Sequence, residues 1–557
     1  MNTSGGWAPF LLVIAVAAPL AGALATAALS RRLGERAAAT SIAGGALGLL
    51  AALPLLVAVG VDGPVSVLAG DAGLHAGRLG ALLLVLIGVV GLVVPAFASR
   101  YLAGDPRHTR FFVLTGVTIS ATAAMVAAAT LAGLVVAWVI AGAGLVALIA
   151  HERGLPAAGA ASRRAAACFT VGDGALVLAL VLVIATIGDL DLRDPAAAAR
   201  QLEGATVGGI GLGPLVAVLV VIAALVRSAQ VPVGGWLPGT VAAPTPVSAL
   251  LHAGLVNAGG ILLVTLAPIV LLSPVAVALA FAAGAVTALY GTALMLARSD
   301  IKGRLAHSTM GQMGFMVLQC SLGALSAAVF HLVAHGMYKA TLFLGSGGVV
   351  HERSALRRAP RAADARGGTA RALADAAWAV VVPLAALLAA VALLAPGVAG
   401  KPGATVLLAF AWASGAQAAF WWLRLRGAGE LRRTPLALGL LALAMAGYVA
   451  ALGAVEAFLA PALPAMSAAG WAPEWLAAPV LLVAAAVLAL GWSAEIAPGA
   501  AAAIGARTQD LHLRLYAFAR RAGEAPAVGS ALPGRRRRRA VPIPVRPALD
   551  PQHAGSV

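Results

Sequence analysis

Three titratable side chains, His331, His335 and Lys339, follow one another at four-residue spacing in a long apolar stretch. Four residues advance an α-helix by about 6 Å and turn it by roughly 400°, so the three groups form a slanted column on one helix face. Histidine titrates near neutral pH, and lysine, unlike arginine, can lose its proton when it is desolvated. This His–Lys column can therefore pass protons along through water. The alternative is that each imidazole only bonds a neighbouring helix.

Lysine is rare in this chain, which makes the lysine of the column informative. Among the 38 Lys and Arg residues, only Lys302, Lys339 and Lys401 are lysine, and only Lys339 lies well inside an apolar run. The i,i+4 histidines of the column also suit zinc, but no nearby carboxylate or thiolate completes such a site. Cys168 and Cys320 form no CxxC pair. We therefore expect no catalytic residue, metal site or bound cofactor in this chain.

Other polar residues interrupt the apolar runs, where charge is costly and usually functional. Arg227 ends one run, His252 lies in the next and His307 opens a later one. The prolines between the first two break helices, which a membrane tolerates only beside protein or water and which often flank ion pathways. An ordinary interhelical loop is the alternative. We expect supporting polar or helix-breaking roles for Ser228, Gln230, Pro232, Pro244, Thr245, Pro246, Ser248 and, in an earlier run, Asp173.

Composition places these residues in a membrane. The 557-residue chain has a mean hydropathy of +0.95 and only 11% charged residues, against about 25% in soluble proteins. Its net charge of +17 lies between apolar runs, which favours membrane orientation over nucleic-acid binding. The segment GGIGLG at 208–213 follows no strand expected from the sequence and begins an apolar run, so we do not interpret it as a nucleotide loop.

We expect an all-α polytopic membrane protein with about fifteen transmembrane helices, because a bilayer needs about 20 apolar residues per helix. The runs centre near residues 19, 48, 89, 121, 140, 177, 219, 256, 285, 316, 337, 384, 414, 447 and 486. Loops after odd-numbered runs are basic, and loops after even-numbered runs are nearly neutral or mildly acidic. The positive-inside rule then predicts an outer N-terminus and a cytoplasmic C-terminus in a bacterial inner membrane.

The two ends of the chain also carry expectations. The first run lacks a preceding basic segment and predicts a retained helix, not a cleaved signal. The segment RTQDLHLRLYAFARRAG near the C-terminus predicts an amphipathic surface helix. Beyond residue 524 we expect disorder, with RRRRR at 535–539 touching anionic membrane lipid or docking a partner.

Long motifs resemble one family. The segments RSAQVPVGGWLPGTVAAPTPVSALLHAG, ARSDIKGRLAHSTMGQMGFM and FHLVAHGMYKATLFLGSG are similar to the antiporter-like subunits. These include the L subunit of respiratory complex I, the large subunit of Mrp-type antiporters and the DabB subunit of inorganic carbon transporters. The resemblance implies two inverted five-helix repeats with broken helices. It divides the chain into 1–99, three N-terminal helices; 100–268, the first repeat; 269–426, the second repeat; 427–499, two further helices; and 500–557, a cytoplasmic segment and tail.

The resemblance also implies roles. Arg227 occupies the position of the family's central lysine, and His252 matches the histidine of the eighth helix. The His–Lys column matches the second-half proton relay. We expect the whole relay to comprise His331, His335, Lys339, His252, Arg227 and His307. Where the family carries an acid in the fifth helix, this chain has Val139 after Trp138. Since arginine keeps its proton, the first half-channel is expected to be disabled and the column to be the main path left.

The segment LHAGLVNAGGILL at 251–263 resembles the DabB type more than the L type. This implies a subunit that conducts protons, or sodium, to energise a large zinc-containing, carbonic-anhydrase-like partner of the DabA type. The zinc then belongs to the partner, which captures CO2 as bicarbonate. One alternative is a proton-translocating L-type subunit of an NADH-quinone oxidoreductase (complex I) or of a related Mrp or hydrogenase complex. Another is a structural subunit that has lost conduction.

Overall fold

The computed structural model describes residues 6–67, 73–152, 154–298, 300–356, 369–398, 402–425, 433–463 and 492. The chain divides into two compact units, Met1–Gly523 and Glu524–Val557, and the second lies wholly outside the described residues. Lys401, the RRRRR run, the expected amphipathic segment and all but Trp492 of the fifteenth apolar run also lie outside them.

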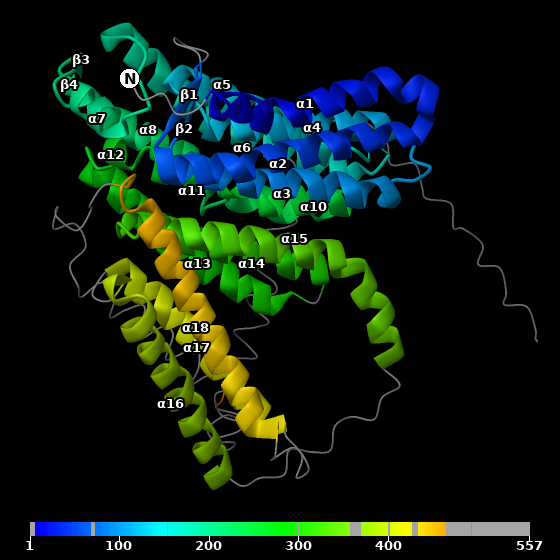
Figure 1. Ribbon diagram of the computed structural model, residues 1–557, viewed down its shortest axis with the longest axis vertical. Helices are drawn as coiled ribbons and strands as arrows, with labels where there is room; N and C mark the ends of the chain where they lie inside the picture. Colours follow the sequence, from blue (N-terminus) through cyan, green and yellow to red (C-terminus); the bar gives the residue numbers. More distant parts are fainter. Residues whose placement is uncertain are drawn as a thin grey trace, which may run out of the picture. The chain divides into compact units, whose positions relative to one another are not determined.

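The described part of the chain is almost entirely helical (Figure 1). Two short antiparallel pairs, β1 with β2 and β3 with β4, are its strands. The helices are α1 (Ala8–Leu33), α2 (Ala38–Asp62), α3 (Arg78–Tyr101), α4 (His108–Val126), α5 (Leu131–Ile149), α6 (Pro156–Ile187), α7 (Pro195–Glu203), α8 (Leu212–Arg227), α9 (Trp236–Gly239), α10 (Thr245–Ala253), α11 (Ala258–Thr265), α12 (Ala267–Val270), α13 (Pro274–Ala297), α14 (Ile301–Ser321), α15 (Leu325–Leu356), α16 (Thr369–Leu394), α17 (Pro402–Leu425) and α18 (Thr434–Leu459). The strands are β1 (Val65–Val67), β2 (Leu74–Ala76), β3 (Thr206–Val207) and β4 (Ile210–Gly211).

These helices confirm the expected fold class. The expected centres from 19 to 447 fall within α1 to α6, α8, the α10–α11 pair and α13 to α18. By length and composition, 11 stretches of the described residues can cross a membrane, and one of them holds α1 and α2 in succession. Among the described residues, the 3-10 turn Leu255–Asn257 separates α10 from α11. By contrast, α16 continues through Pro383.

Hydrogen bonds between loops show which loops lie together at each end of the helix bundle. At one end, Glu35 accepts from the Gly104 N–H at 2.5 Å, and Arg107 donates to the His151 carbonyl at 2.9 Å. These contacts join the turns that follow α1, α3 and α5. At the other end, the His75 N–H donates to the Ala127 carbonyl at 2.7 Å, which joins the loops after α2 and α4. Basic loops are therefore joined to basic loops and nearly neutral loops to nearly neutral ones, which agrees with the alternation of loop charge along the sequence.

A carboxylate and an imidazole hold the basic end together. Nε2 of His151 lies 3.1 Å from Oδ2 of Asp105, and the Arg107 N–H donates to Oδ1 at 2.6 Å. Burial raises the pKa of Asp105, but the hydrogen bonds from Arg107 and His151 and their charges outweigh it. The pKa of Asp105 therefore lies below its ordinary value of 3.8.

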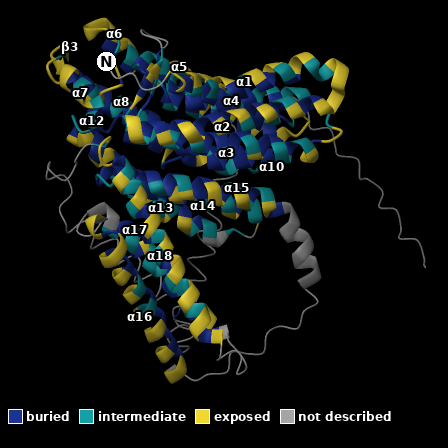
Figure 2. Cartoon of the chain, viewed as in Figure 1, coloured by how far each residue is buried: buried dark blue, intermediate teal, exposed yellow. Residues whose placement is uncertain are grey.

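Small residues let helices approach closely. A Cβ placed on Gly22 of α1 would lie 3.0 Å from the Cα of Gly44 on α2, and the reverse holds for Gly44. Such contacts replace side-chain burial as the basis of helix packing in a membrane. Figure 2 shows the result: buried residues fill the contacts between helices, and exposed ones lie on their outer faces.

The last described helix returns to the first ones. Arg78, at the start of α3, donates to the Phe458 carbonyl of α18 at 2.9 Å and to the Gly60 carbonyl of α2 at 3.3 Å. Its guanidinium carbon also lies 5.4 Å from the centre of the Phe458 ring. One cation thus ties together three helices from opposite ends of the described chain.

Candidate functional site

The position of Arg227 is set by the way α8 ends. The backbone of Ala229 has a φ of 53°, in the left-handed region. This lets the Ala229 N–H donate to the Val226 carbonyl at 3.1 Å and the Gln230 N–H donate to the Leu225 carbonyl at 2.9 Å. The two bonds form a Schellman motif, which stops the helix and satisfies its last carbonyls. Arg227 is therefore the final residue of α8, held inside the bundle instead of continuing along a helix.

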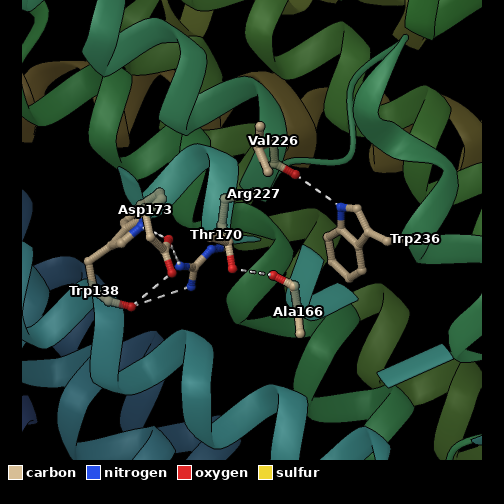
Figure 3. A network of polar contacts seen from close by, with 7 residues as sticks. All are labelled: Trp138, Ala166, Thr170, Asp173, Val226, Arg227 and Trp236. Carbon is tan, nitrogen blue, oxygen red and sulfur yellow. Dashed lines mark hydrogen bonds and ion pairs between the residues drawn. The ribbon is translucent and has the colours of Figure 1, made fainter. Parts of the chain in front are cut away.

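A carboxylate from α6 pairs with this arginine (Figure 3). Nη2 of Arg227 lies 2.6 Å from Oδ1 of Asp173, and the indole N–H of Trp138 donates to the same oxygen at 2.7 Å. The side chain of Arg227 is 2% exposed and that of Asp173 is 19% exposed. Although α5 carries no acid, the arginine thus has a counter-charge from the next helix. Both residues are candidates in the sequence, but their separation of 54 positions does not predict that they pair.

Aromatic rings hold the guanidinium on two sides. Its central carbon lies 4.3 Å from the centre of the Trp138 ring and 4.4 Å from that of Phe169, distances at which a cation is attracted to the ring face. A Cβ on Gly142 of α5 would lie 2.6 Å from Nη2 of Arg227. The site is therefore shaped for one fixed cation. Because arginine does not release its proton, the guanidinium of Arg227 holds a fixed positive charge beside Asp173.

The His–Lys column lies on α15. The rings of His331 and His335 are edge to face, with centres 6.0 Å apart. Lys339, which is 1% exposed, donates to the Leu305 carbonyl of α14 at 3.5 Å. Both ring nitrogens of His335 are buried and have no partner within the described residues. Such nitrogens need water or another polar group, so the middle of the column is the place where water is required.

Two glutamines of α14 hold the first histidine of the column. Nδ1 of His331 lies 3.0 Å from Oε1 of Gln319, and Nε2 lies 2.9 Å from Oε1 of Gln312. A neutral imidazole has one donor and one acceptor, whereas the charged ring has two donors. A glutamine amide offers either group after a half-turn, so this pair can serve both states. Nε2 of Gln319 has no partner in the described part of the chain, which leaves that amide free to turn.

The broken helix beside the column carries His252. Its ring stacks on Phe343 of α15, with centres 4.3 Å apart and planes inclined by 13°. Its Nδ1 is buried and without a partner among the described residues, as is Oδ1 of Asn257 at the α10–α11 break. A small cavity of about 20 Å³ lies against Asn257 and Gly254. This space suffices for one water molecule, which needs about 10–15 Å³.

The remaining expected residues support the breaks in the helices. Ser228 donates to the Val256 carbonyl at 2.9 Å, which connects the end of α8 to the α10–α11 break. Gln230 donates to the Ser228 carbonyl at 2.7 Å. Pro244 precedes α10, Thr245 and Pro246 begin it, and Ser248 is buried within it; Pro232 lies in the turn after α8. Within the described residues, the polar contacts of Arg227 are with Trp138 and Asp173, and none joins it directly to the column.

The hydrogen bond of His307 does not involve the column. Its Nδ1 is 2.8 Å from the Gly303 carbonyl, one turn earlier in α14. This bond occupies one nitrogen within its own helix. Its role in proton transfer stays a prediction.

Some polar residues were not anticipated. Gln312 and Gln319 are seven residues apart, two helical turns, so they lie on one face of α14; this spacing was the available signal. Asp375 of α16 and Arg424 of α17 are both buried, with Nη1 and Oδ2 3.9 Å apart. No group of three or more His, Cys, Asp or Glu side chains able to hold a metal ion lies in the described part.

Comparisons with known proteins place this geometry in a family. Residues 128–423 match the model of the NADH:quinone oxidoreductase/Mrp antiporter transmembrane region, and residues 65–112 match that of the N-terminus of complex I chain 5. A probable inorganic carbon transporter subunit, DabB1 of Halothiobacillus neapolitanus, is 36% identical over 80% of this chain and 81% of its own length. The NADH-quinone oxidoreductase subunit L of Mycobacterium tuberculosis is 36% identical over 50% of this chain and 44% of its own.

A solved structure agrees with these matches. The Mrp complex of Dietzia sp. DQ12-45-1b contains a chain with a TM-score of 0.58 and 25% identity, which covers 92% of this chain and 60% of that one. That chain shares the helical architecture described above. The chain therefore belongs to the antiporter-like family of NADH:quinone oxidoreductase and Mrp antiporter membrane subunits, and is an ion-translocating, multi-pass membrane protein.

Proposed function

We propose that this chain is the proton-conducting membrane subunit of an inorganic carbon uptake complex. The observation that carries the proposal is the match to DabB1, which extends over four-fifths of both chains, at 80% and 81%. A second carbon transporter subunit, DabB of Bacillus subtilis, is 33% identical over 55% of this chain. The proposed partner is a large zinc-containing, carbonic-anhydrase-like subunit of the DabA type, which captures CO2 as bicarbonate.

The His–Lys column is the proposed proton path. Its groups are nitrogen bases that accept and release protons, whereas sodium requires a shell of oxygen ligands. The unpartnered nitrogens of His335 lie between His331 on one side and Lys339 on the other. Water at this point would connect the two, because successive members of the column are separated by about 6 Å along the helix. His252 supplies a neighbouring base across the contact with α15.

The first repeat has a different proposed role. Arg227 and Asp173 neutralise one another at 2.6 Å, and two aromatic rings cover the guanidinium. This arrangement favours a fixed ion pair that supports the fold, with conduction confined to the second repeat. We further propose that the basic end of the bundle faces the bacterial cytoplasm, in accordance with the positive-inside rule.

Complementation tests the proposal. A host that requires high CO2 is given genes for this chain and its proposed partner, and growth in air is measured. We expect rescue by the native chain, loss of rescue by Lys339→Ala and retained rescue by Lys302→Ala. Lys302 is a matched control, since it lies at the start of α14 and donates to the Ala243 carbonyl at 3.3 Å. Full rescue by Lys339→Ala would contradict the proton path.

A second candidate is a subunit of a complex I-type oxidoreductase, which the match to the Mycobacterium tuberculosis L subunit favours. Affinity purification of the tagged chain from its own cells distinguishes the two. Co-purifying flavin and iron–sulfur subunits would support the second candidate. A zinc-containing soluble partner would support the first.

A further inference from the structure

A groove on the membrane-facing surface has no role in the path described above. It has a volume of about 790 Å³ and lies between α2, α3 and α15. Leu92, Val93, Phe97 and Leu344 form much of its wall, and Arg100 and Tyr101 close one end. Leu92 and Tyr101 are nine residues apart on α3, or roughly 13 Å along the helix. This is close to half of the ~30 Å hydrocarbon thickness of a bilayer, so the groove has the depth of one leaflet.

The end of the groove is polar and basic. Arg100 and Tyr101 belong to the last turn of α3, at the boundary of a candidate membrane span. The side chain of Arg100 has no hydrogen bond or ion pair to another described residue. Tyr101 is 48% exposed and stacks on Phe97, with ring centres 5.8 Å apart. An aromatic ring and a free guanidinium at this depth are the usual anchors of a lipid headgroup.

The surroundings of the groove favour a negative ligand. Glu35 accepts from the Gly104 N–H at 2.5 Å, just after α3. The last turn of α1, with Arg31 and Arg32, and the 3-10 turn with Arg36 therefore lie near the end of α3. Glu35 itself is engaged in that bond, and the carboxylate of Asp105 is engaged by His151 and Arg107. No described carboxylate contacts Arg100. Arginines outnumber carboxylates here, so the net charge at the mouth of the groove is positive.

We propose that the groove binds an anionic phospholipid. The headgroup phosphate lies against Arg100, and the acyl chains lie along Leu92, Val93 and Phe97. Leu344 of α15 forms the opposite wall, five residues beyond Lys339. The bound lipid thus fills the space between α3 and the helix that carries the His–Lys column. The proposal is independent of which complex the chain joins.

Lipid retention by the full-length chain tests the proposal. The chain is purified in mild detergent, incubated with equimolar phosphatidylglycerol and phosphatidylcholine, and examined by native mass spectrometry. We expect one retained phosphatidylglycerol in the native chain. Arg100→Gln should reduce the preference for phosphatidylglycerol about fivefold, since one arginine near an anionic headgroup contributes about that factor. Ala96→Trp, which fills the groove, should abolish retention of both lipids.

Two variants serve as controls. Arg163→Gln removes an exposed arginine of α6 at the same end of the bundle, and Leu47→Trp adds bulk at a residue of α2 that is 51% exposed and outside the groove. Both should retain phosphatidylglycerol as the native chain does. Equal selectivity in Arg100→Gln and Arg163→Gln would overturn the proposal. So would a groove-filled variant that keeps its lipid but loses a co-purifying protein, since the groove would then be a protein interface.

Discussion

Replacing Asp173 with asparagine removes the charge of the buried pair while keeping nearly the same shape. The new amide oxygen can still accept from Trp138, but Arg227 loses its counter-charge. Loss of one partner from a buried pair costs about 3–5 kcal/mol. Asp173 is 19% exposed, and the rings of Trp138 and Phe169 still contact the guanidinium. We therefore expect Asp173→Asn to lower the free energy of unfolding by about 2 kcal/mol, below that range.

A double-mutant cycle measures the pair itself. Asp173→Asn, Arg227→Gln and the double variant are unfolded by titration with sodium dodecyl sulfate in mixed micelles. We expect a coupling energy of about 2 kcal/mol, within the usual span for contacting groups. The double variant should then be more stable than Asp173→Asn alone, because no unpaired charge remains buried.

The chain supplies its own control for this measurement. Arg193 and Asp191 form an ion pair at 2.5 Å, with side chains 52% and 47% exposed. Exposed pairs contribute little to stability, so the same cycle at these positions should give a much smaller coupling. Coupling at Arg227 and Asp173 below about 0.5 kcal/mol would refute the view that they form one fixed unit.

Three further changes test other parts of the molecule. Gly142→Val should destabilise the chain by about 1–3 kcal/mol in the same unfolding assay, because its side chain would occupy the space of the guanidinium. Gln319→Leu leaves one nitrogen of His331 unpartnered and should slow pH-driven flux in proteoliposomes several-fold, whereas Gln319→Glu should retain more flux; equal flux in both variants would exclude a role for this contact. The pKa of Asp105 in the folded chain lies below its ordinary value of 3.8. The stability that its bonds contribute is therefore fully present above about pH 4 and is lost as the pH falls through the lowered pKa. Asp105→Asn should therefore flatten the acid limb of the melting temperature against pH, and an unchanged limb would contradict the assignment.

Apolar length and loop charge were enough to predict the helices. Each of the first fourteen expected runs corresponds to helical elements, since a membrane-spanning segment must satisfy its backbone internally and so becomes a helix. The column on α15 was predictable for the same reason, because its four-residue spacing needs only one helix to be read. The break at the end of α8 was anticipated from the prolines, but the left-handed Ala229 that sets it was not.

The pairing of Asp173 with Arg227 was beyond sequence reasoning. The two residues are 54 positions apart, and which face of α6 meets α8 depends on packing. The family pattern drew attention to the missing acid of α5, whereas the counter-charge comes from α6. Gln312 and Gln319 were overlooked for a similar reason, since amides on one face of an apolar helix gain meaning only when a partner such as His331 is placed opposite them.

The contact of Arg78 with α18 has a consequence for biosynthesis. Its bond to the Gly60 carbonyl spans 18 residues, but its bond to the Phe458 carbonyl spans 380. At a synthesis rate of about 5–20 residues per second, the guanidinium waits roughly 20–80 s for its second partner. During this interval the first helices are inserted while one of their cations is only half satisfied. The contact between α3 and α18 therefore forms only after α18 is made, and a chain truncated before Phe458 would leave the guanidinium of Arg78 with only the Gly60 carbonyl of these two partners.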